Sequence, residues 1–172
     1  ITMSNSALSN WLEKDTMAST ASRGVISGVL GGLAGTIVKS AIERFLPVRQ
    51  PNTESAQLKL VDNISEKLTG EPVSASNRDL AEQLVNIPIG VTLGASLGYA
   101  KRDRPETNVV EGALFGTTAY LATHETSLPL MGLEEAPEDI PVKLQANEFL
   151  AHVAFGITAE LVRGWVARRL DD

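Results

Sequence analysis

The residues that could do chemistry are few. The chain of 172 residues has two His and no Cys, which excludes disulfides, thiolate zinc sites and cysteine nucleophiles. Glu148 and His152 are four residues apart and share one helix face, while His124 ends an earlier apolar segment and Glu125 follows it directly. If the helices that carry these residues are antiparallel neighbours, all four side chains lie at the same level along the bundle. The sequence therefore predicts a polar cluster of His124, Glu125, Glu148 and His152.

Three kinds of chemistry suit such a cluster: a structural His–carboxylate hydrogen bond, a proton- or ion-handling site, and a divalent-metal site. An ionisable group at bilayer depth costs about 2.5–3.5 kcal/mol, so it is a candidate functional site. Near a helix end, interfacial water would lower that cost. We expect a structural His152–Glu148 pair first. No catalytic residue, cofactor or metal ligand is assigned from the sequence.

A second polar set is predicted at the opposite end of the helices. Glu160 and Arg163 are three residues apart, which allows a local ion pair, and Glu111 lies at a similar depth in the preceding apolar segment. We expect this pair to neutralise a helix end. Lys39, inside the first apolar segment, is expected to extend its alkyl stem outward to the membrane surface.

Four apolar segments must position these residues, and they are residues 24–46, 80–101, 109–124 and 147–170. The first has about 23 residues and spans roughly 34 Å as a helix, enough to cross a bilayer. We predict an all-α, polytopic transmembrane helical bundle with about four spans. A soluble all-α domain is the alternative, because 21% of residues are charged and the mean hydropathy is +0.01.

Glycine spacing favours the transmembrane bundle over the soluble domain. Glycines recur every four residues along three of the segments, and those predicted to pack helices are Gly28, Gly32, Gly35, Gly90, Gly94, Gly98, Gly112 and Gly116. In lipid such stripes let helix backbones approach closely, whereas in water they mainly weaken the helix.

The remaining segments complete the predicted organisation. Residues 1–22 form a polar N-terminal segment without the apolar core of a secretory signal, and residues 23–172 form one transmembrane domain. Within the first long connection, apolar residues between 55 and 69 have the spacing of an amphipathic helix at the membrane surface.

The charge distribution predicts the topology. Basic residues gather in the connection 101–104 and at the C-terminus, whereas the connection 126–146 is mainly acidic. The positive-inside tendency then places both termini in the cytoplasm. Fifteen basic against 21 acidic residues leave a net charge of −6, which argues against a nucleic-acid partner.

The run from His124 to Leu133, with its Pro129-Leu130-Met131-Gly132-Leu133 block, is followed by an acidic segment, by Glu148-x-x-x-His152 and by Glu160-Leu161-Val162-Arg163. In this order the chain resembles the YagU-like family of small bacterial inner-membrane proteins, over roughly residues 24–170. The resemblance implies an integral inner-membrane location and brings no established activity with it.

We therefore expect a non-enzymatic, multi-pass inner-membrane protein. It would act as a scaffold or accessory subunit, or self-assemble through its glycine faces, with the lipid bilayer and a second copy or a larger membrane complex as partners. The alternative is a small proton- or ion-conducting protein that uses the His and Glu residues of the third and fourth segments.

Overall fold

The computed structural model describes the backbone of residues 5–171 and the side chains of residues 16–170 apart from Ala18. The described part is helical and contains no strand, which confirms the all-α class. Its elements are α1 (Asn5–Phe45), α2 (Ala56–Thr69), η1 (Ala75–Asn77), α3 (Arg78–Ala100), α4 (Val109–Ala122), η2 (Thr123–Ser127), α5 (Leu128–Leu130), η3 (Pro137–Asp139) and α6 (Val142–Asp171).

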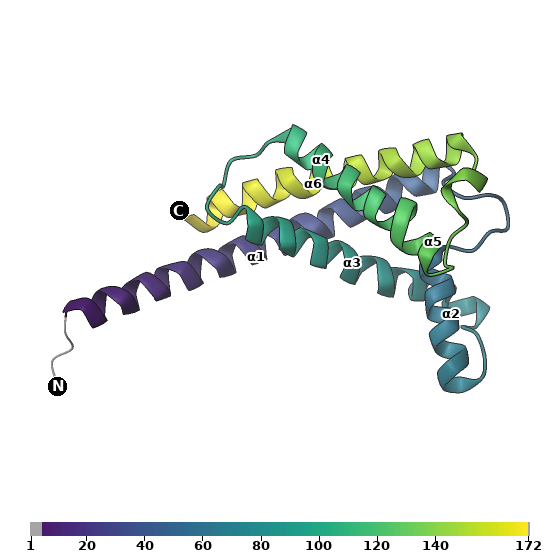
Figure 1. Ribbon diagram of the computed structural model, residues 1–172, viewed down its shortest axis with the longest axis horizontal. Coiled ribbons are helices and arrows are strands. Elements are labelled where there is room, and N and C mark those ends of the chain that lie inside the picture. The colour runs from purple at the N-terminus through teal and green to yellow at the C-terminus, as the bar shows by residue number, and fades with distance from the viewer. Residues whose placement is uncertain (1–4, 172) are drawn as a thin grey trace.

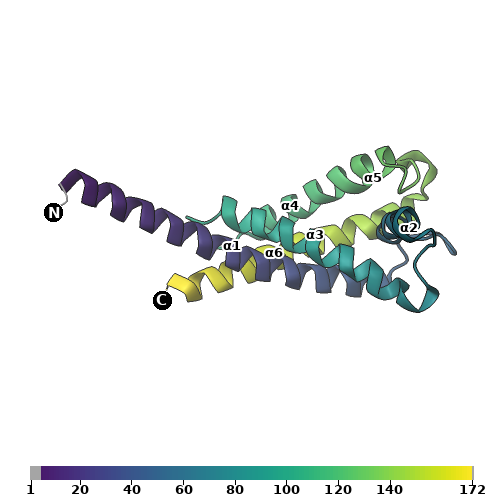
Figure 2. The same ribbon diagram turned by 90° about the horizontal axis from the view of Figure 1, so that it is seen from below.

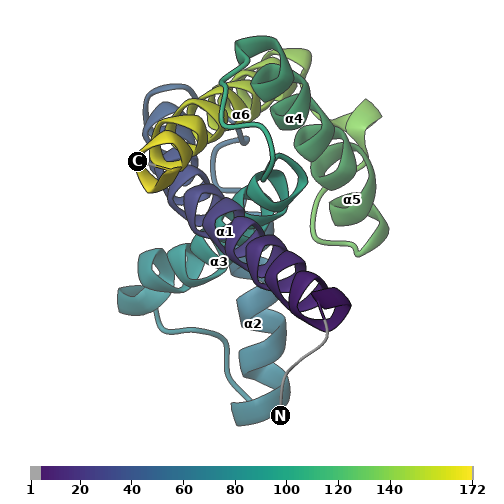
Figure 3. The same ribbon diagram turned by 90° about the vertical axis from the view of Figure 1, so that its left-hand side faces the viewer.

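The long helices form an antiparallel bundle around α1. Helix α1 packs against α3 on one side and α6 on the other, and α6 in turn packs against α4. Seen along the bundle, α1 lies in the centre (Figure 3). The connection between α3 and α4 lies at the same end as the C-terminus, while α2 and α5 lie at the opposite end (Figures 1 and 2). The helical bundle thus has two well-separated ends, each with its own connections.

Three helical segments are long and apolar enough to cross a membrane, and they are Ser19–Phe45, Ala75–Ala100 and Val142–Leu170. The remaining predicted span, residues 109–124, is also helical. Helix α4 alone has 14 residues, about 21 Å at 1.5 Å per residue, short of the roughly 30 Å hydrocarbon core. It continues through a π-helical turn into α5, so the helical run extends beyond the predicted segment.

Helix α1 extends further than the apolar pattern indicates. It runs without interruption from Asn5 through the expected boundary between residues 22 and 23. Its N-terminal part projects beyond the bundle (Figure 1). Residues 1–4 of the predicted polar segment lie outside the described residues.

Glycine backbones make the contact between α1 and α3. A Cβ added at Gly28 would lie 2.8 Å from the Gly98 Cα atom, and one at Gly32 would lie 2.9 Å from the Gly94 Cα atom. A methyl group cannot fit at such distances without separating the helices. The two stripes therefore face each other within one chain.

Helix α6 uses the same kind of contact with two partners. A Cβ at Gly35 of α1 would lie 2.8 Å from the Phe155 carbonyl oxygen, and one at Gly112 of α4 would lie 2.9 Å from the Gly156 carbonyl oxygen. One at Gly116 would lie 3.0 Å from the Val153 Cα atom. These faces are occupied inside the chain, so a second copy would have to use other surfaces.

Helix α2 forms where the amphipathic helix is predicted. The Ser55 side chain caps its N-terminus by accepting a hydrogen bond from the Leu58 backbone N–H, and Gly70 ends it with a φ of 83°. That left-handed conformation favours glycine. In Figure 1 the helix lies across the end of the bundle, an orientation suited to a membrane surface.

Candidate functional site

A buried carboxylate lies at the centre of the first candidate site. The Glu148 side chain is 8% exposed, and its Oε1 atom lies 3.0 Å from Lys39 Nζ. The same oxygen lies 3.3 Å from His124 Nε2 and 3.3 Å from His152 Nδ1. We call His124, Glu148 and His152, with Lys39 and Glu134 as their direct partners, the His cluster.

Different elements bring the His cluster together. Glu148 and His152 lie one turn apart on α6, while Lys39 comes from α1, which packs beside α6. His124 lies in the π-helical turn η2 that follows α4. A π turn inserts one extra residue and so rotates the side chains after it, and such turns are frequent at functional sites.

Both imidazole rings are oriented by a second contact. His124 Nδ1 lies 2.7 Å from Glu134 Oε2 in the connection before α6. His152 Nδ1 lies 3.0 Å from the Glu148 backbone oxygen, one turn earlier. In each case the ring nitrogen donates to an oxygen, which fixes the tautomer when the ring is neutral.

An aromatic side chain covers the cluster. The Tyr120 ring stacks on the His124 ring at 5.7 Å between centroids and meets the His152 ring edge-on at 5.7 Å. The Tyr120 hydroxyl donates to Glu125 Oε1 at 2.7 Å. Glu125, predicted as a member of the cluster, therefore pairs with Tyr120 rather than with a histidine.

The buried carboxylate is incompletely satisfied. Glu148 Oε1 has no hydrogen-bond partner of good geometry among the described residues, although three nitrogen atoms surround it. A cavity of about 100 Å³ borders the cluster, and its lining includes His124, His152 and Lys39 together with apolar side chains of α3. The Lys39 ammonium is the nearest of the three nitrogen atoms to Glu148 Oε1.

The structure corrects the expected direction of Lys39. Its side chain is 14% exposed and forms ion pairs with Glu43 and Glu148, so it points into the bundle instead of outward. The spacing of Lys39 and Glu43, four residues apart, is the sequence signal that favours an inward pair. The Glu134 contact depends on the path of the connection before α6, for which the sequence carries no comparable signal.

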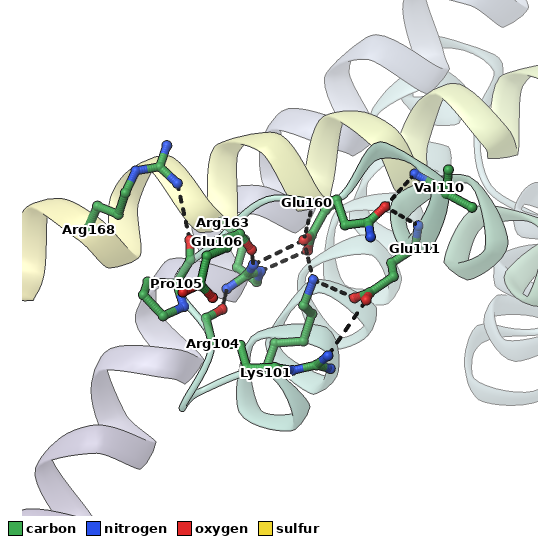
Figure 4. A network of polar contacts seen from close by, with 10 residues as sticks. Lys101, Arg104, Pro105, Glu106, Val110, Glu111, Glu160, Arg163 and Arg168 are labelled. Atoms are coloured by element: carbon green, nitrogen blue, oxygen red, sulfur yellow. Dashed lines mark hydrogen bonds and ion pairs between the residues drawn. The ribbon is translucent and has the colours of Figure 1, made fainter.

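The second candidate site lies at the other end of the bundle and is drawn in Figure 4. Arg163 Nε lies 2.8 Å from Glu160 Oε2, and the side chains of Arg163 and Glu160 are 1% and 0% exposed. Arg163 also donates to the backbone oxygens of Arg104 and Glu106, at 3.0 and 2.8 Å. The pair therefore fastens the α3–α4 connection to α6.

Lys101 joins Glu111 to this network. Lys101 Nζ lies 2.7 Å from Glu111 Oε2 and also contacts Glu160. Glu111, predicted beside the pair, reaches it through Lys101 and also forms an ion pair with Arg104 at 3.6 Å. From the sequence, Lys101 belongs to the basic connection 101–104 that predicts the membrane topology. In the structure its side chain is buried, with 5% exposed. We call Lys101, Glu111, Glu160 and Arg163 the Arg163 cluster.

Comparison with known proteins places the chain in a family. No curated protein and no solved structure matches it. The model of a family described as protein of unknown function, DUF1440, matches residues 33–161. This range covers well over half of the chain and includes every member of the His cluster. The chain belongs to the DUF1440 family.

Proposed function

We propose that this chain is a non-enzymatic integral protein of the bacterial inner membrane and acts there as a scaffold or accessory subunit. Three helical segments long and apolar enough to span a membrane support the integral location. The resemblance to the YagU-like inner-membrane proteins supports the choice of membrane. Cysteine is absent and there are only two His, which supports a role without catalysis.

One observation carries the proposal: a layer of close backbone contacts lies between the two polar clusters. Gly31 and Gly35 of α1 face the Ala159 and Phe155 carbonyl groups of α6. Gly116 of α4 faces α6 from the other side. A path for ions between the clusters would have to separate backbones that are already in contact, which costs dispersion energy along the whole interface.

The partner surface follows from the same packing. The glycine stripes are occupied within the chain, so a second copy or a larger membrane complex would dock on outward-facing apolar side chains. Ile37, Leu114 and Trp165 are 63%, 60% and 56% exposed. In a membrane these side chains contact either lipid or a partner helix.

The test compares assembly with conduction. Native mass spectrometry of the protein extracted with native lipids should detect a complex heavier than one chain. Liposomes that contain the protein and a pH-sensitive dye should leak protons no faster than protein-free liposomes. A monomer in the first experiment would contradict the scaffold role.

A second candidate function is proton or ion conduction through the His cluster, and the cavity of about 100 Å³ lined by His124, His152 and Lys39 favours it. His152→Gln keeps hydrogen-bonding groups but cannot relay protons near neutral pH. A proton flux in the parent protein that this folded variant abolishes would support conduction and overturn the scaffold proposal.

A further inference from the structure

We propose that His124, Glu148 and His152 bind a divalent first-row transition-metal ion, and that Zn²⁺ fits them best. One ligand atom from each residue lies within 4.8 Å of those from the other two. Two imidazoles and one carboxylate suit Zn²⁺ and its neighbours in the series, whereas the absence of thiolates disfavours soft ions. This inference holds whether or not the chain acts as a scaffold.

The tautomer of His124 suits metal binding. The Nδ1 atom of His124 faces the Glu134 carboxylate at 2.7 Å, and that of His152 faces a backbone carbonyl oxygen at 3.0 Å. When Nδ1–H donates, the Nε2 lone pair of His124 is available to an ion. The nitrogen of His152 that lies 3.3 Å from Glu148 Oε1 is Nδ1, so this ring gives up its hydrogen bond to the carbonyl oxygen when it binds an ion through that atom. Metal-ligating histidines nearly always have such a partner on the other ring nitrogen.

The distance between two of the ligand atoms already matches a tetrahedral ion. His124 Nε2 and Glu148 Oε1 are 3.3 Å apart. Ligands about 2.0–2.1 Å from a tetrahedral Zn²⁺ ion are roughly 3.3–3.4 Å from each other. The ion would also coordinate the Oε1 atom, which has an ion pair with Lys39 but no hydrogen bond of good geometry.

The surroundings of the three ligands leave room for a fourth ligand, and they include a lysine that competes with the metal ion for Glu148. The cavity of about 100 Å³ beside both histidines has space for ordered water, which would complete the coordination as in zinc sites with three protein ligands. Lys39 Nζ lies 3.0 Å from Glu148 Oε1, so an arriving ion competes with its charge. Lys39 also contacts Glu43, and that pair can hold it when the ion binds.

The experiment uses the full chain in detergent, without a histidine tag and after treatment with a chelator. Titration with Co²⁺, followed by visible absorption, should give one equivalent of a four- or five-coordinate species that Zn²⁺ displaces. Because the chain has only two His, imidazole coordination identifies these residues. His124→Gln and His152→Gln should each weaken Co²⁺ binding at least about 100-fold.

A matched pair of neighbouring variants separates the metal site from general electrostatics. Glu134→Gln removes the charged partner of His124 and should weaken binding about 10–100-fold, the usual effect of losing such a partner. Glu135→Gln removes the same charge from the next residue, which contacts Gln50, and should leave binding unchanged.

Three results would overturn the proposal. One is a Co²⁺ spectrum that remains that of the hydrated ion at millimolar concentration, and another is unchanged binding when both histidines are replaced. The third is an equal effect of the two glutamate variants. If a histidine variant fails to fold, the Co²⁺ spectrum of the parent protein and the comparison of Glu134→Gln with Glu135→Gln still test the proposal.

Discussion

Arg163 illustrates how one side chain in a long helix can hold a loop against a bundle. Its guanidinium contacts a carboxylate on its own helix and two backbone carbonyl groups of the α3–α4 connection. Planar geometry and a charge that does not titrate make arginine suited to several hydrogen bonds at once. A buried pair of this kind contributes little net stability when intact, but removing one partner leaves an uncompensated charge.

Arg163→Met should lower the free energy of unfolding by about 3–5 kcal/mol, because Glu160 stays buried and the loop carbonyls lose their donors. Chemical unfolding in detergent measures this change. Arg168→Met is the control, since Arg168 is exposed and donates to the Pro105 carbonyl oxygen at 3.1 Å; its effect should stay below about 1 kcal/mol. Equal effects of the two variants would contradict the role assigned to Arg163.

His152 supports a contrast of two substitutions. His152→Ala removes the donor to the Glu148 carbonyl oxygen and a ring that packs against Tyr120, so it should cost about 1–3 kcal/mol or more. His152→Gln keeps a donor and much of the volume and should be clearly less destabilising. Thermal unfolding without added metal distinguishes them, and a Gln variant as unstable as the Ala variant would refute a hydrogen-bonding role for the ring.

At the scale of elements, the sequence predicts the helices well because apolar run length and glycine spacing are properties of a single segment. The orientation of Lys39 is different, because it depends on which face of α1 meets α6, and α1 carries glycines on two faces. The Glu134–His124 contact depends on the path of a connection and on a π turn, neither of which leaves a local pattern. The helical continuation of α1 toward Asn5 is likewise absent from the apolar pattern, since that segment is polar.

Gly94→Leu should destabilise the bundle strongly, because a Cβ at that position would overlap the Gly32 backbone and overpacking costs about 1–3 kcal/mol or more. The melting temperature in detergent is the measurement. Ser96→Leu, on an exposed face of the same helix, is the matched control and should melt like the parent. If both variants melt like the parent, α1 and α3 do not pack through their glycines.

At the scale of the whole molecule, the distribution of polar groups gives the bundle two distinct ends. The Arg163 cluster and the basic α3–α4 connection lie at one end, and α2, α5 and the acidic connection 131–141 lie at the other (Figure 1). The positive-inside tendency predicts that the first end faces the cytoplasm. Between the ends, apolar side chains cover the outside of the helices, and many are more than half exposed.

Washing membranes with alkaline carbonate should leave the protein in the pellet, because removing three apolar helices from the hydrocarbon core exposes a large apolar surface to water. A peripheral membrane protein that lacks spanning helices is the control and should be released. Recovery of this chain in the supernatant would favour a soluble helical bundle.

Single-cysteine labelling tests the central claim most directly, because the chain has no Cys and each variant therefore carries one reactive thiol. Asp103 is exposed in the α3–α4 connection, and Asp139 is exposed at the end of η3 in the connection before α6. In intact spheroplasts, a membrane-impermeant thiol reagent should label Asp139→Cys at once and Asp103→Cys only after lysis. Labelling of both variants, or of neither, before lysis would contradict a chain that crosses the membrane with these two connections on opposite sides.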